Sequence, residues 1–586
     1  MKNNTGILRL FDLVSYSSSR YAQKTAFCTR DGEKWSKTTF EEYQKKVNLV
    51  SYGLATLGIK KGDKIITISR NRAEFNFVDM GIMQTGAIHV PLYANIDDLK
   101  LQAILVETGC KIVFTGSAQI YRKVLLLKDQ AISPDQLFCF DVIEGAATLD
   151  ALLKLGSENQ NEIVLQTLKA GILSEDIASI TYISGSTTEV KGIEHTHSDH
   201  IHNSLAIAES TCILNGMNLL SLLPLAHSYE RSINYCSQYL GVTTWYNNNF
   251  KTIGQELQEI KPDVIFVVPF LLQKLYNLLI AKIQQECGMP APDFLKGIEY
   301  AMTHEKQEGI QYADSEQKQL FTNISLSANK LMGGNIKMLY CGGASLDQNL
   351  RRFFDNCGMT CYEGYGLTEA GPVVTHNSPV FRKAGTVGRP IAETTIRIGA
   401  DGEVLVKSPS AMKRYYNHPD SENPVDKDGW LHTGDIGELD NDGYLRLTGV
   451  KKRIFKQSSG IYTDPLTLEK LLETLPLIMK SLVIGHNRDY LAALIIPDIN
   501  LISEKLSVTD PIMESGGKIY RQEELTVLFA SEIKTINDQN KTLDSVLRFV
   551  LVDDEWTIQN QGLNINSELN RRLLIEKYQI IINQLY

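Results

Sequence analysis

A loop of small and hydroxyl-bearing residues follows the apolar segment 177–183, which we predict to be a buried strand. The loop reads Ser184-Gly185-Ser186-Thr187-Thr188 and leads to Lys191. Main-chain N–H groups of small residues, hydroxyls and a nearby ammonium group are donors suited to phosphates. The lysine precedes a glycine instead of following one, which excludes the P-loop NTPase pattern. The segment therefore predicts either a cradle for a nucleoside triphosphate or an ordinary polar loop.

Three other short segments carry groups that could complete a nucleotide site. Gly342-Gly343-Ala344 follows a predicted strand at 336–340, and adjacent glycines permit close approach of a flat ring to the backbone. Tyr365-Gly366-Leu367-Thr368-Glu369 combines an aromatic ring, a hydroxyl and a carboxylate, which suit a purine, a phosphate and a divalent cation. Asp435 could accept two hydrogen bonds from a ribose diol, or it could simply form a turn.

The elements needed to position these groups are those of an α/β protein. Helical patterns alternate with short apolar strands such as 64–69 and 111–115, which predicts a doubly wound sheet with its ligand beyond the carboxyl ends of the strands. We expect an N-terminal domain over residues 1–449, which includes a β-rich subdomain at 386–447. A charged boundary follows at 450–453. We then expect a small α+β domain over 454–586, with a strand at 491–497.

Composition narrows the class of partner. The chain has 586 residues, 43% of them hydrophobic and 22% charged, which indicates a globular protein of more than one domain. A net charge of -9 argues against nucleic acid. No apolar run is long enough to span a bilayer, and the N-terminus lacks an uninterrupted signal-peptide core. We therefore expect a cytoplasmic protein with at most peripheral contact with a membrane.

Taken together and in order, these motifs resemble the acyl-adenylate-forming enzymes, and among them most closely the long-chain fatty acyl-CoA synthetases. The segments that carry the resemblance are Tyr182–His197, Leu222–Arg231, Gly342–Leu346, Gly364–Glu369, Gly402–Tyr416, Trp430–Asp435 and Leu491–Asp498. The resemblance implies a two-step reaction with Mg²⁺ as cofactor. A fatty carboxylate attacks the α-phosphate of ATP to give acyl-AMP and pyrophosphate, and the thiol of coenzyme A then displaces AMP after the small domain rotates.

The resemblance also assigns roles to residues. Residues Ser184 to Thr188 and Lys191 would hold the phosphates, with Ser186 and Glu369 near magnesium. Gly342, Gly343, Ala344 and Tyr365 would enclose the adenine, Gly366 and Thr368 would also bind the nucleotide, and Asp435 would hold the ribose. Lys452 would be the hinge and His227 would lie near the acyl group, although a capping or packing histidine would look the same. Trp245 and Phe270 are candidates for lining the acyl tunnel.

Several positions depart from the family pattern. Thr188 and Val190 stand where the family has glycine and proline, and Val450 stands where it has an arginine that contacts ribose. Phe270 replaces an arginine after Val268-Pro269. An ungapped alignment of 556–578 places Glu568 at the family's C-terminal lysine. A carboxylate near phosphates repels them where an ammonium would attract, so adenylation should be slowed.

Three hypotheses follow from these matches and departures. The first is an AMP-forming ligase of long-chain fatty acids, possessing ATP, magnesium and coenzyme A sites. The second is a degenerate homologue that binds nucleotide or acyl-AMP as a regulatory or scaffolding protein. The third retains only the thioester-forming half of the reaction. The thiol could belong to coenzyme A or to a carrier protein, and the sequence leaves the acyl chain length and the oligomeric state open.

Overall fold

The computed structural model describes most of the chain. The described residues are 6–127, 136–184, 190–247, 249–286, 288–305, 316–419, 423–451, 455–456, 458, 462–486, 488–499, 501–502, 512–514, 518–520, 522–539, 545–557, 560, 562–563 and 569–586. The chain divides into two compact units. The first comprises residues 1–398, 405–433 and 439–446, and the second comprises residues 399–404, 434–438 and 447–586. Among the described residues no helix is long and apolar enough to cross a membrane.

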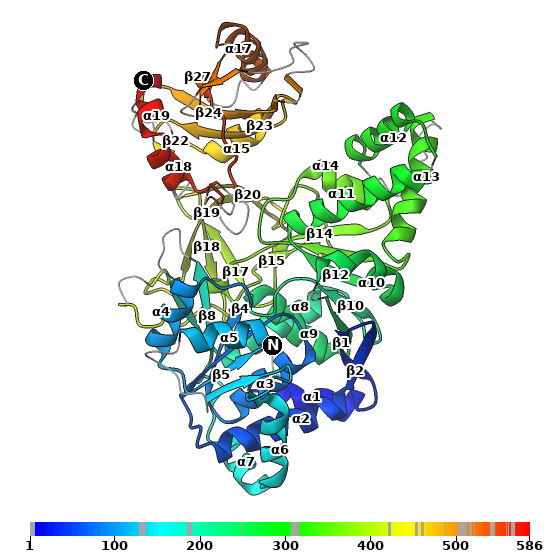
Figure 1. Cartoon of the computed structure of the whole chain (residues 1–586), viewed down its shortest axis with the longest axis vertical. Coiled ribbons are helices and arrows are strands. Elements are labelled where there is room, and N and C mark those ends of the chain that lie inside the picture. The colour runs from blue at the N-terminus through cyan, green and yellow to red at the C-terminus, as the bar shows by residue number, and fades with distance from the viewer. Residues whose placement is uncertain are drawn as a thin grey trace. The chain divides into compact units, whose positions relative to one another are not determined.

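The first unit contains two large, mainly parallel sheets (Figure 1). The nine-stranded sheet has the order β16-β15-β14-β13-β12-β10-β11-β1-β2. Its strands are β1 (Thr25–Asp31), β2 (Lys34–Thr39), β10 (Asn218–Ser221), β11 (Thr243–Tyr246), β12 (Val264–Val267), β13 (Met338–Cys341), β14 (Thr360–Tyr365), β15 (Thr375–His376) and β16 (Arg389–Pro390). The five neighbouring pairs from β14 through β1 are parallel, so their carboxyl ends share one edge.

The seven-stranded sheet has the order β7-β6-β5-β3-β4-β8-β9. Its strands are β3 (Lys64–Ser69), β4 (Ile88–Tyr93), β5 (Ile112–Thr115), β6 (Leu137–Cys139), β7 (Ala147–Thr148), β8 (Ile177–Ser184) and β9 (Val190–Thr196). All neighbouring pairs are parallel except β8 and β9, which form an antiparallel pair around the glycine, serine and threonine loop. The predicted doubly wound α/β class is confirmed.

Helices connect the strands of the first unit. They are α1 (Asp12–Tyr21), α2 (Phe40–Thr56), α3 (Ala73–Gln84), α4 (Asp98–Thr108), α5 (Ala118–Leu126), α6 (Leu149–Glu158), α7 (Glu162–Ala170), α8 (His197–Ser210), α9 (Ser228–Leu240), η3 (Phe250–Thr252), α10 (Ile253–Ile260), α11 (Pro269–Glu286), α12 (Ala291–Thr303), α13 (Glu316–Leu331), α14 (Gln348–Asn356) and η4 (Thr368–Ala370). Capping explains several starts: Thr39 and Thr196 form capping boxes with Glu42 and Asp199.

A four-stranded sheet follows, in the order β17-β18-β19-β20. Its strands are β17 (Thr395–Ile398), β18 (Glu403–Lys407), β19 (Leu431–Leu439) and β20 (Leu445–Val450). The sheet begins later than the β-rich subdomain predicted from residue 386, because β16 pairs with β15 and so belongs to the nine-stranded sheet.

The remaining elements belong to the second unit. They are β21 (Phe455–Lys456), β22 (Tyr462–Thr463), α15 (Pro465–Leu472), β23 (Ile478–Ile484), β24 (Leu491–Pro497), β25 (Ile512–Glu514), β26 (Lys518–Tyr520), α17 (Gln522–Gln539), β27 (Val546–Leu551), α18 (Arg571–Lys577) and α19 (Gln579–Leu585). Strands β23, β24 and β27 form one sheet, with β24 buried along its whole length.

Helix α3 is the most enclosed element of the first unit. Of its 12 residues, all but Glu74 are buried. The hydrophobic cluster that contains α3 also contains Phe27 and Tyr246 from the nine-stranded sheet and Ile65 and Phe114 from the seven-stranded sheet. A helix that is buried all round must face protein on every side, so both sheets pack on α3.

Helix α9 is also buried, yet it is rich in polar residues. Its Ile233 and Cys236 pack in one hydrophobic cluster with strands β10, β12 and β13. Its first turn carries Glu230, which is 1% exposed. One oxygen of Glu230 accepts a hydrogen bond from Ser221, and the other has no partner among the described residues. Burial raises the pKa of Glu230 to about 8, so the carboxyl is protonated at neutral pH.

We expect Glu230→Gln to change the pH dependence of stability. The pKa of Glu230 in the folded state lies above its unfolded value of about 4.3. The contribution of protonated Glu230 to the free energy of unfolding is therefore complete below pH ~4. It is lost as the pH rises to about 8, because the unfolded state releases this proton more readily than the folded state does. The free energy of unfolding of Glu230→Gln relative to wild type should increase by about 1.4 kcal/mol per pH unit across this range. Denaturant unfolding of both proteins at pH 6, 7 and 8 measures this difference in free energy. A difference that stays constant with pH would contradict the protonated state of Glu230.

A second prediction concerns the packing of α6 on α2. A Cβ atom at Gly156 would lie 2.0 Å from the carbonyl oxygen of Leu49, whereas a Cβ at Gly254 in α10 would meet no atom within 4 Å. Gly156→Ala should therefore lower the thermal unfolding midpoint by several degrees, since overpacking typically costs about 1–3 kcal/mol. Gly254→Ala is the matched control and should leave the midpoint unchanged or raise it. Equal midpoints for the two variants would contradict the close approach.

Candidate nucleotide and acyl site

Two of the predicted catalytic side chains gather around one tyrosine. The Lys191 Nζ lies 5.0 Å from the ring centroid of Tyr415, a cation–π distance. The hydroxyl of the same tyrosine donates a hydrogen bond of 3.1 Å to Glu369 Oε1. The structure thus brings Lys191 and Glu369 to one place and adds Tyr415 between them.

The backbone fixes this grouping from three sides. Lys191 lies in β9 opposite Ile183 of β8, and an isolated bridge joins Ile193 of β9 to Tyr415. Glu369 is the central residue of η4, and its carbonyl accepts the N–H of Met412 at 2.8 Å. Main-chain bonds therefore hold the backbone of residues that are far apart in sequence close together.

The phosphate loop itself is only partly described. Ser184 ends β8 and pairs with Val190, the first residue of β9. The predicted phosphate-binding residues Gly185, Ser186, Thr187 and Thr188 lie outside the described residues. Val190 adopts an extended conformation as a strand residue. A β-branched residue is favourable there, so replacing the family's proline by Val190 introduces no backbone strain.

The predicted adenine-binding segments form close-packed turns. Gly343 has φ = +85°, a conformation that favours glycine, and it is exposed together with Ala344. A Cβ at Gly366 would lie 1.7 Å from the carbonyl oxygen of Pro372, so the backbone approach requires glycine. Gly342 is buried, and its N–H donates to the Val267 carbonyl at 3.2 Å.

Tyr365 and Thr368 continue the same wall. Tyr365 is 9% exposed at the end of β14, where its carbonyl accepts the N–H of Val374 at 2.9 Å. The hydroxyl groups of Thr368 and Ser228 lie 2.9 Å apart. This contact links η4, which carries Glu369, to the first turn of α9.

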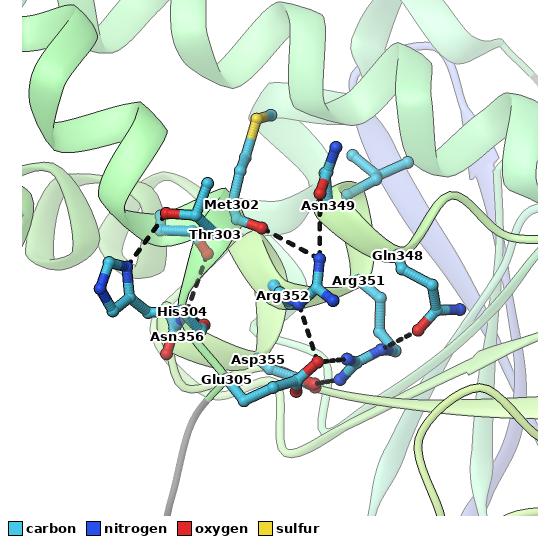
Figure 2. Close-up of polar contacts among 12 residues, drawn as sticks. Met302, Thr303, His304, Glu305, Gln348, Asn349, Arg351, Arg352, Asp355 and Asn356 are labelled. Carbon is cyan, nitrogen blue, oxygen red and sulfur yellow. Dashed lines mark hydrogen bonds and ion pairs between the residues drawn. The ribbon is translucent and has the colours of Figure 1, made fainter. Parts of the chain in front are cut away.

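An ion-pair network supports the helix that follows the Gly342–Ala344 turn (Figure 2). Arg351 of α14 is 2% exposed and binds both Glu305 and Asp355, the latter at 2.6 Å. Arg352 donates to Glu305 at 2.7 Å. Arg351 also donates to Gln348, whose amide group donates to Glu363 of β14 at 3.2 Å. The network ties α14 and the end of α12 to the strand that leads to Tyr365.

His227 occupies the N-cap position of α9. Its Nδ1 accepts the N–H of Tyr229 at 3.2 Å, and the side chain is exposed. Only Nδ1 takes part in the cap, so Nε2 of the same ring is not used by it. His227 can therefore cap α9 and also contact an acyl group. Asn71 holds the preceding turn, since it donates to the Leu223 carbonyl at 2.6 Å and accepts the Leu225 N–H at 2.8 Å.

A cavity of about 1,370 Å³ opens at the carboxyl ends of strands from both large sheets. Its wall includes Arg72, Glu74 and Asp141, which are joined by two ion pairs of 2.8 Å. Neither Trp245 nor Phe270 is among the lining residues, although Asn247 and Leu271 are. Instead, Trp245 packs edge-on against Trp35 at 5.0 Å and donates to Asn218 at 2.9 Å, while Phe270 is 56% exposed.

The other predicted residues lie in the second unit or beyond the described residues. Asp435 is the middle residue of β19, in the second unit. Val450 ends β20, and the adjacent Lys451 binds Asp401 at 2.8 Å and Glu403 at 2.9 Å. The predicted hinge residue Lys452 and the predicted lysine-replacing residue Glu568 both lie outside the described residues.

Tyr415 is the residue that the sequence did not single out. It is the penultimate residue of a motif, Gly402–Tyr416, that contributed to the resemblance, and the signal available was a pair of adjacent tyrosines after a strand. Its placement depends on a bridge to β9 more than 200 residues away in sequence, which no local pattern indicates.

The arrangement suits a metal-bound nucleotide better than a metal held by protein alone. Among the described residues no group of three or more His, Cys, Asp or Glu side chains could hold a metal ion. A single carboxylate such as Glu369, beside a lysine and a tyrosine hydroxyl, matches Mg²⁺ that takes its other ligands from phosphates and water. The residues therefore fit Mg-ATP, and Lys191 is a cation of the kind that neutralises phosphate charge.

Known proteins are similar in sequence along most of this chain. Long-chain-fatty-acid–CoA ligase FadD15 of Mycobacterium bovis is 26% identical over 580 residues, covering 94% of this chain and 92% of the relative. Long-chain-fatty-acid–[acyl-carrier-protein] ligase AEE15 of Arabidopsis thaliana is also 26% identical, covering 98% and 86%.

Solved structures agree on the fold. The o-succinylbenzoate coenzyme A synthetase of Bacillus subtilis in complex with ATP and magnesium ion superposes with a TM-score of 0.67 at 20% identity, covering 96% of this chain and 98% of that one. A Mycobacterium tuberculosis fatty acyl CoA synthetase gives a TM-score of 0.65 at 19% identity, covering 99% and 100%. The family model for the AMP-binding enzymes matches residues 14–416. The chain therefore belongs to the AMP-binding enzyme family.

Proposed function

We propose that the protein is an AMP-forming ligase that activates a long-chain fatty carboxylate as acyl-AMP and transfers the acyl group to the thiol of coenzyme A. The observation that carries the proposal is the grouping of Lys191, Tyr415 and Glu369. An ammonium group and a carboxylate that share one tyrosine can bind triphosphate and its metal ion together. The substrate class is supported by relatives that match most of the chain and are named as long-chain fatty acid ligases.

In the first step, a carboxylate oxygen attacks the α-phosphorus of ATP and the bond to the pyrophosphate group breaks. Lys191 would offset the negative charge that accumulates on the phosphates, and Glu369 would hold a magnesium ion, which would supply further charge neutralisation of the phosphate oxygens. The turn Gly342–Ala344 and the Tyr365 ring would enclose adenine, with Thr368 beside them. Asp435 would accept hydrogen bonds from the ribose.

In the second step, a thiolate attacks the acyl carbonyl carbon, and AMP leaves with the former carboxylate oxygen. Lys452 would be the hinge about which residues 454–586 rotate between the steps. The two relatives differ in acceptor, since one is named as a CoA ligase and the other as an acyl-carrier-protein ligase. Coenzyme A is the acceptor proposed here, and a carrier-protein thiol is the alternative.

A paired assay tests the proposal. We expect ATP–pyrophosphate exchange that depends on a fatty acid, together with thioester formation from supplied acyl-AMP and coenzyme A. Glu369→Gln should lower exchange by about 10²–10³-fold, because it removes one charged ligand from the reacting centre. Arg414→Gln is a nearby control: its guanidinium binds Glu194 and is largely exposed, so exchange should stay near wild type.

The outcomes of the paired assay separate the three hypotheses. Signal in thioester formation alone would select the half-reaction enzyme. Absence of signal in both reactions would reject the full ligase and the half-reaction enzyme, and it would favour the degenerate homologue that binds nucleotide. Replacing coenzyme A by a holo acyl carrier protein in the second reaction distinguishes the two acceptors.

A second prediction concerns Glu568, which aligns with the family's C-terminal lysine. Glu568→Lys should raise the rate of pyrophosphate exchange by at least tenfold, since it restores an attractive charge toward the phosphates. Thioester formation from supplied acyl-AMP should change little. Glu555→Lys is a control with the same change of charge at an exposed position in the same unit. An equal rise in both variants would indicate a general charge effect and contradict the alignment.

A further inference from the structure

The two large sheets are joined through a buried ion pair that none of the proposed catalytic roles uses. Asp79 of α3 is 0% exposed and Arg231 of α9 is 0% exposed. The Arg231 Nη2 donates to Asp79 Oδ1 at 2.6 Å, and the Tyr235 hydroxyl donates to Asp79 Oδ2 at 2.7 Å. His89 of β4 lies 2.5 Å from Asp79 through its Nδ1 and 2.9 Å from the Thr67 hydroxyl through its Nε2.

The charges of this cluster are defined by their surroundings. Burial alone would raise the pKa of Asp79, but the charge of Arg231 and the contact with His89 hold that pKa well below its usual range. Burial lowers the pKa of His89, so its imidazole is neutral. The pair is therefore Asp79⁻ with Arg231⁺, enclosed by neutral groups.

A second polar contact lies one helical turn away. The Asn234 amide donates to Asn76 of α3 at 2.6 Å, and the Tyr246 hydroxyl of β11 donates to Asn234 at 2.6 Å. Two contacts on the same faces of α3 and α9 fix both the register and the rotation of one helix against the other, because apolar packing alone tolerates small shifts.

The first turn of α9 transmits this register to the candidate site. The Arg231 N–H donates to the His227 carbonyl at 3.1 Å, so Arg231 lies one turn after the residue expected near the acyl group. Ser228, next to His227, contacts Thr368, which precedes Glu369. A displacement of α9 would therefore move His227 and loosen η4 together.

Stability alone does not account for such a pair. Desolvating two charges costs more than an apolar pair of similar volume would, so buried ion pairs are weak evidence for stabilisation and are best attested where they specify one arrangement. We propose that Asp79 and Arg231 are positioning residues that set α9 against α3 and thereby hold His227 and the Ser228–Thr368 contact in place for the carboxylate and the nucleotide. The catalytic part of this inference rests on the proposed function.

The test replaces the pair by apolar residues of similar size. Asp79→Leu combined with Arg231→Met removes both charges, so neither is left buried alone. We expect the fold to persist, with a fatty-acid KM raised at least tenfold and a kcat of pyrophosphate exchange lowered at least tenfold. Arg231→Lys, which keeps the charge but not the planar fork, should retain more activity than Arg231→Met. Wild-type values of KM and kcat in the double variant would overturn the proposal.

A readout independent of catalysis separates this inference from the proposed function. Diethyl pyrocarbonate modifies exposed histidines, and mass spectrometry can follow His227 alongside His304, which is exposed at the end of α12. We expect the double variant to change the modification rate of His227 at least threefold while His304 keeps its rate. If wild type shows no exchange, the proposed function fails, and the His227 rate still decides the positioning role.

A destabilised control excludes a general loosening of the fold. Gly156→Ala disturbs the packing of α6 on α2 at the Leu49 carbonyl, and it touches neither Asp79 nor Arg231. It should lower thermal stability without changing the His227 rate or the fatty-acid KM. The positioning role is overturned if Gly156→Ala changes the His227 modification rate and the fatty-acid KM as much as the double variant does. It is also overturned if the His227 modification rate is unchanged in the double variant.

Discussion

Enclosure of α3 by the two large sheets is the constraint on which the first unit depends. A helix with 11 of 12 residues buried can carry polar side chains only where each finds a partner inside the protein. Asn76, Asp79 and Gln84 meet this requirement through Tyr246, Arg231 and Ser51. Each partner comes from a different element, so α3 specifies how those elements surround it and where the parallel strands end.

Within each large sheet the carboxyl ends of the parallel strands lie along one edge, β8 belonging to the seven-stranded sheet and β13 to the nine-stranded sheet. The glycine, serine and threonine loop follows β8, and the Gly342–Ala344 turn follows β13, each at a carboxyl end. Connections between parallel strands must return along their sheet, so successive loops at the carboxyl edge of one sheet are separated by whole helices. Chemistry-bearing residues can therefore be near one another in space only if the topology is right, which makes the grouping of Lys191 and Glu369 informative about function.

The sequence predicted those parts of the structure that short-range patterns determine. The strands 64–69 and 491–497 agree with β3 and β24, because continuous apolar runs bounded by turn residues are typical of buried strands. The position of Tyr415 and the pairing of Asp79 with Arg231 could not be predicted, since each joins residues more than 150 positions apart. The four-stranded sheet also begins later than the β-rich region predicted over 386–447. A two-residue strand such as β16 has too short a pattern to be assigned to one sheet from sequence.

The departures from the family pattern differ in physical weight. Val190 begins a strand, where a valine is not strained. Because proline and valine are both uncharged, this substitution changes no charge and removes only the rigidity of a proline. Val450 removes a guanidinium, and the neighbouring Lys451 is engaged by Asp401 and Glu403, so that ammonium group cannot serve the ribose without breaking two ion pairs. Glu568, which the alignment places at the family's lysine, is the one departure predicted to reverse the sign of a charge. Loss of one charged donor typically lowers a rate by about 10²–10³-fold, whereas enzymes accelerate reactions by at least about 10⁶-fold. We therefore expect the predicted charge reversal at Glu568 to slow adenylation rather than abolish it, which is consistent with the proposed ligase.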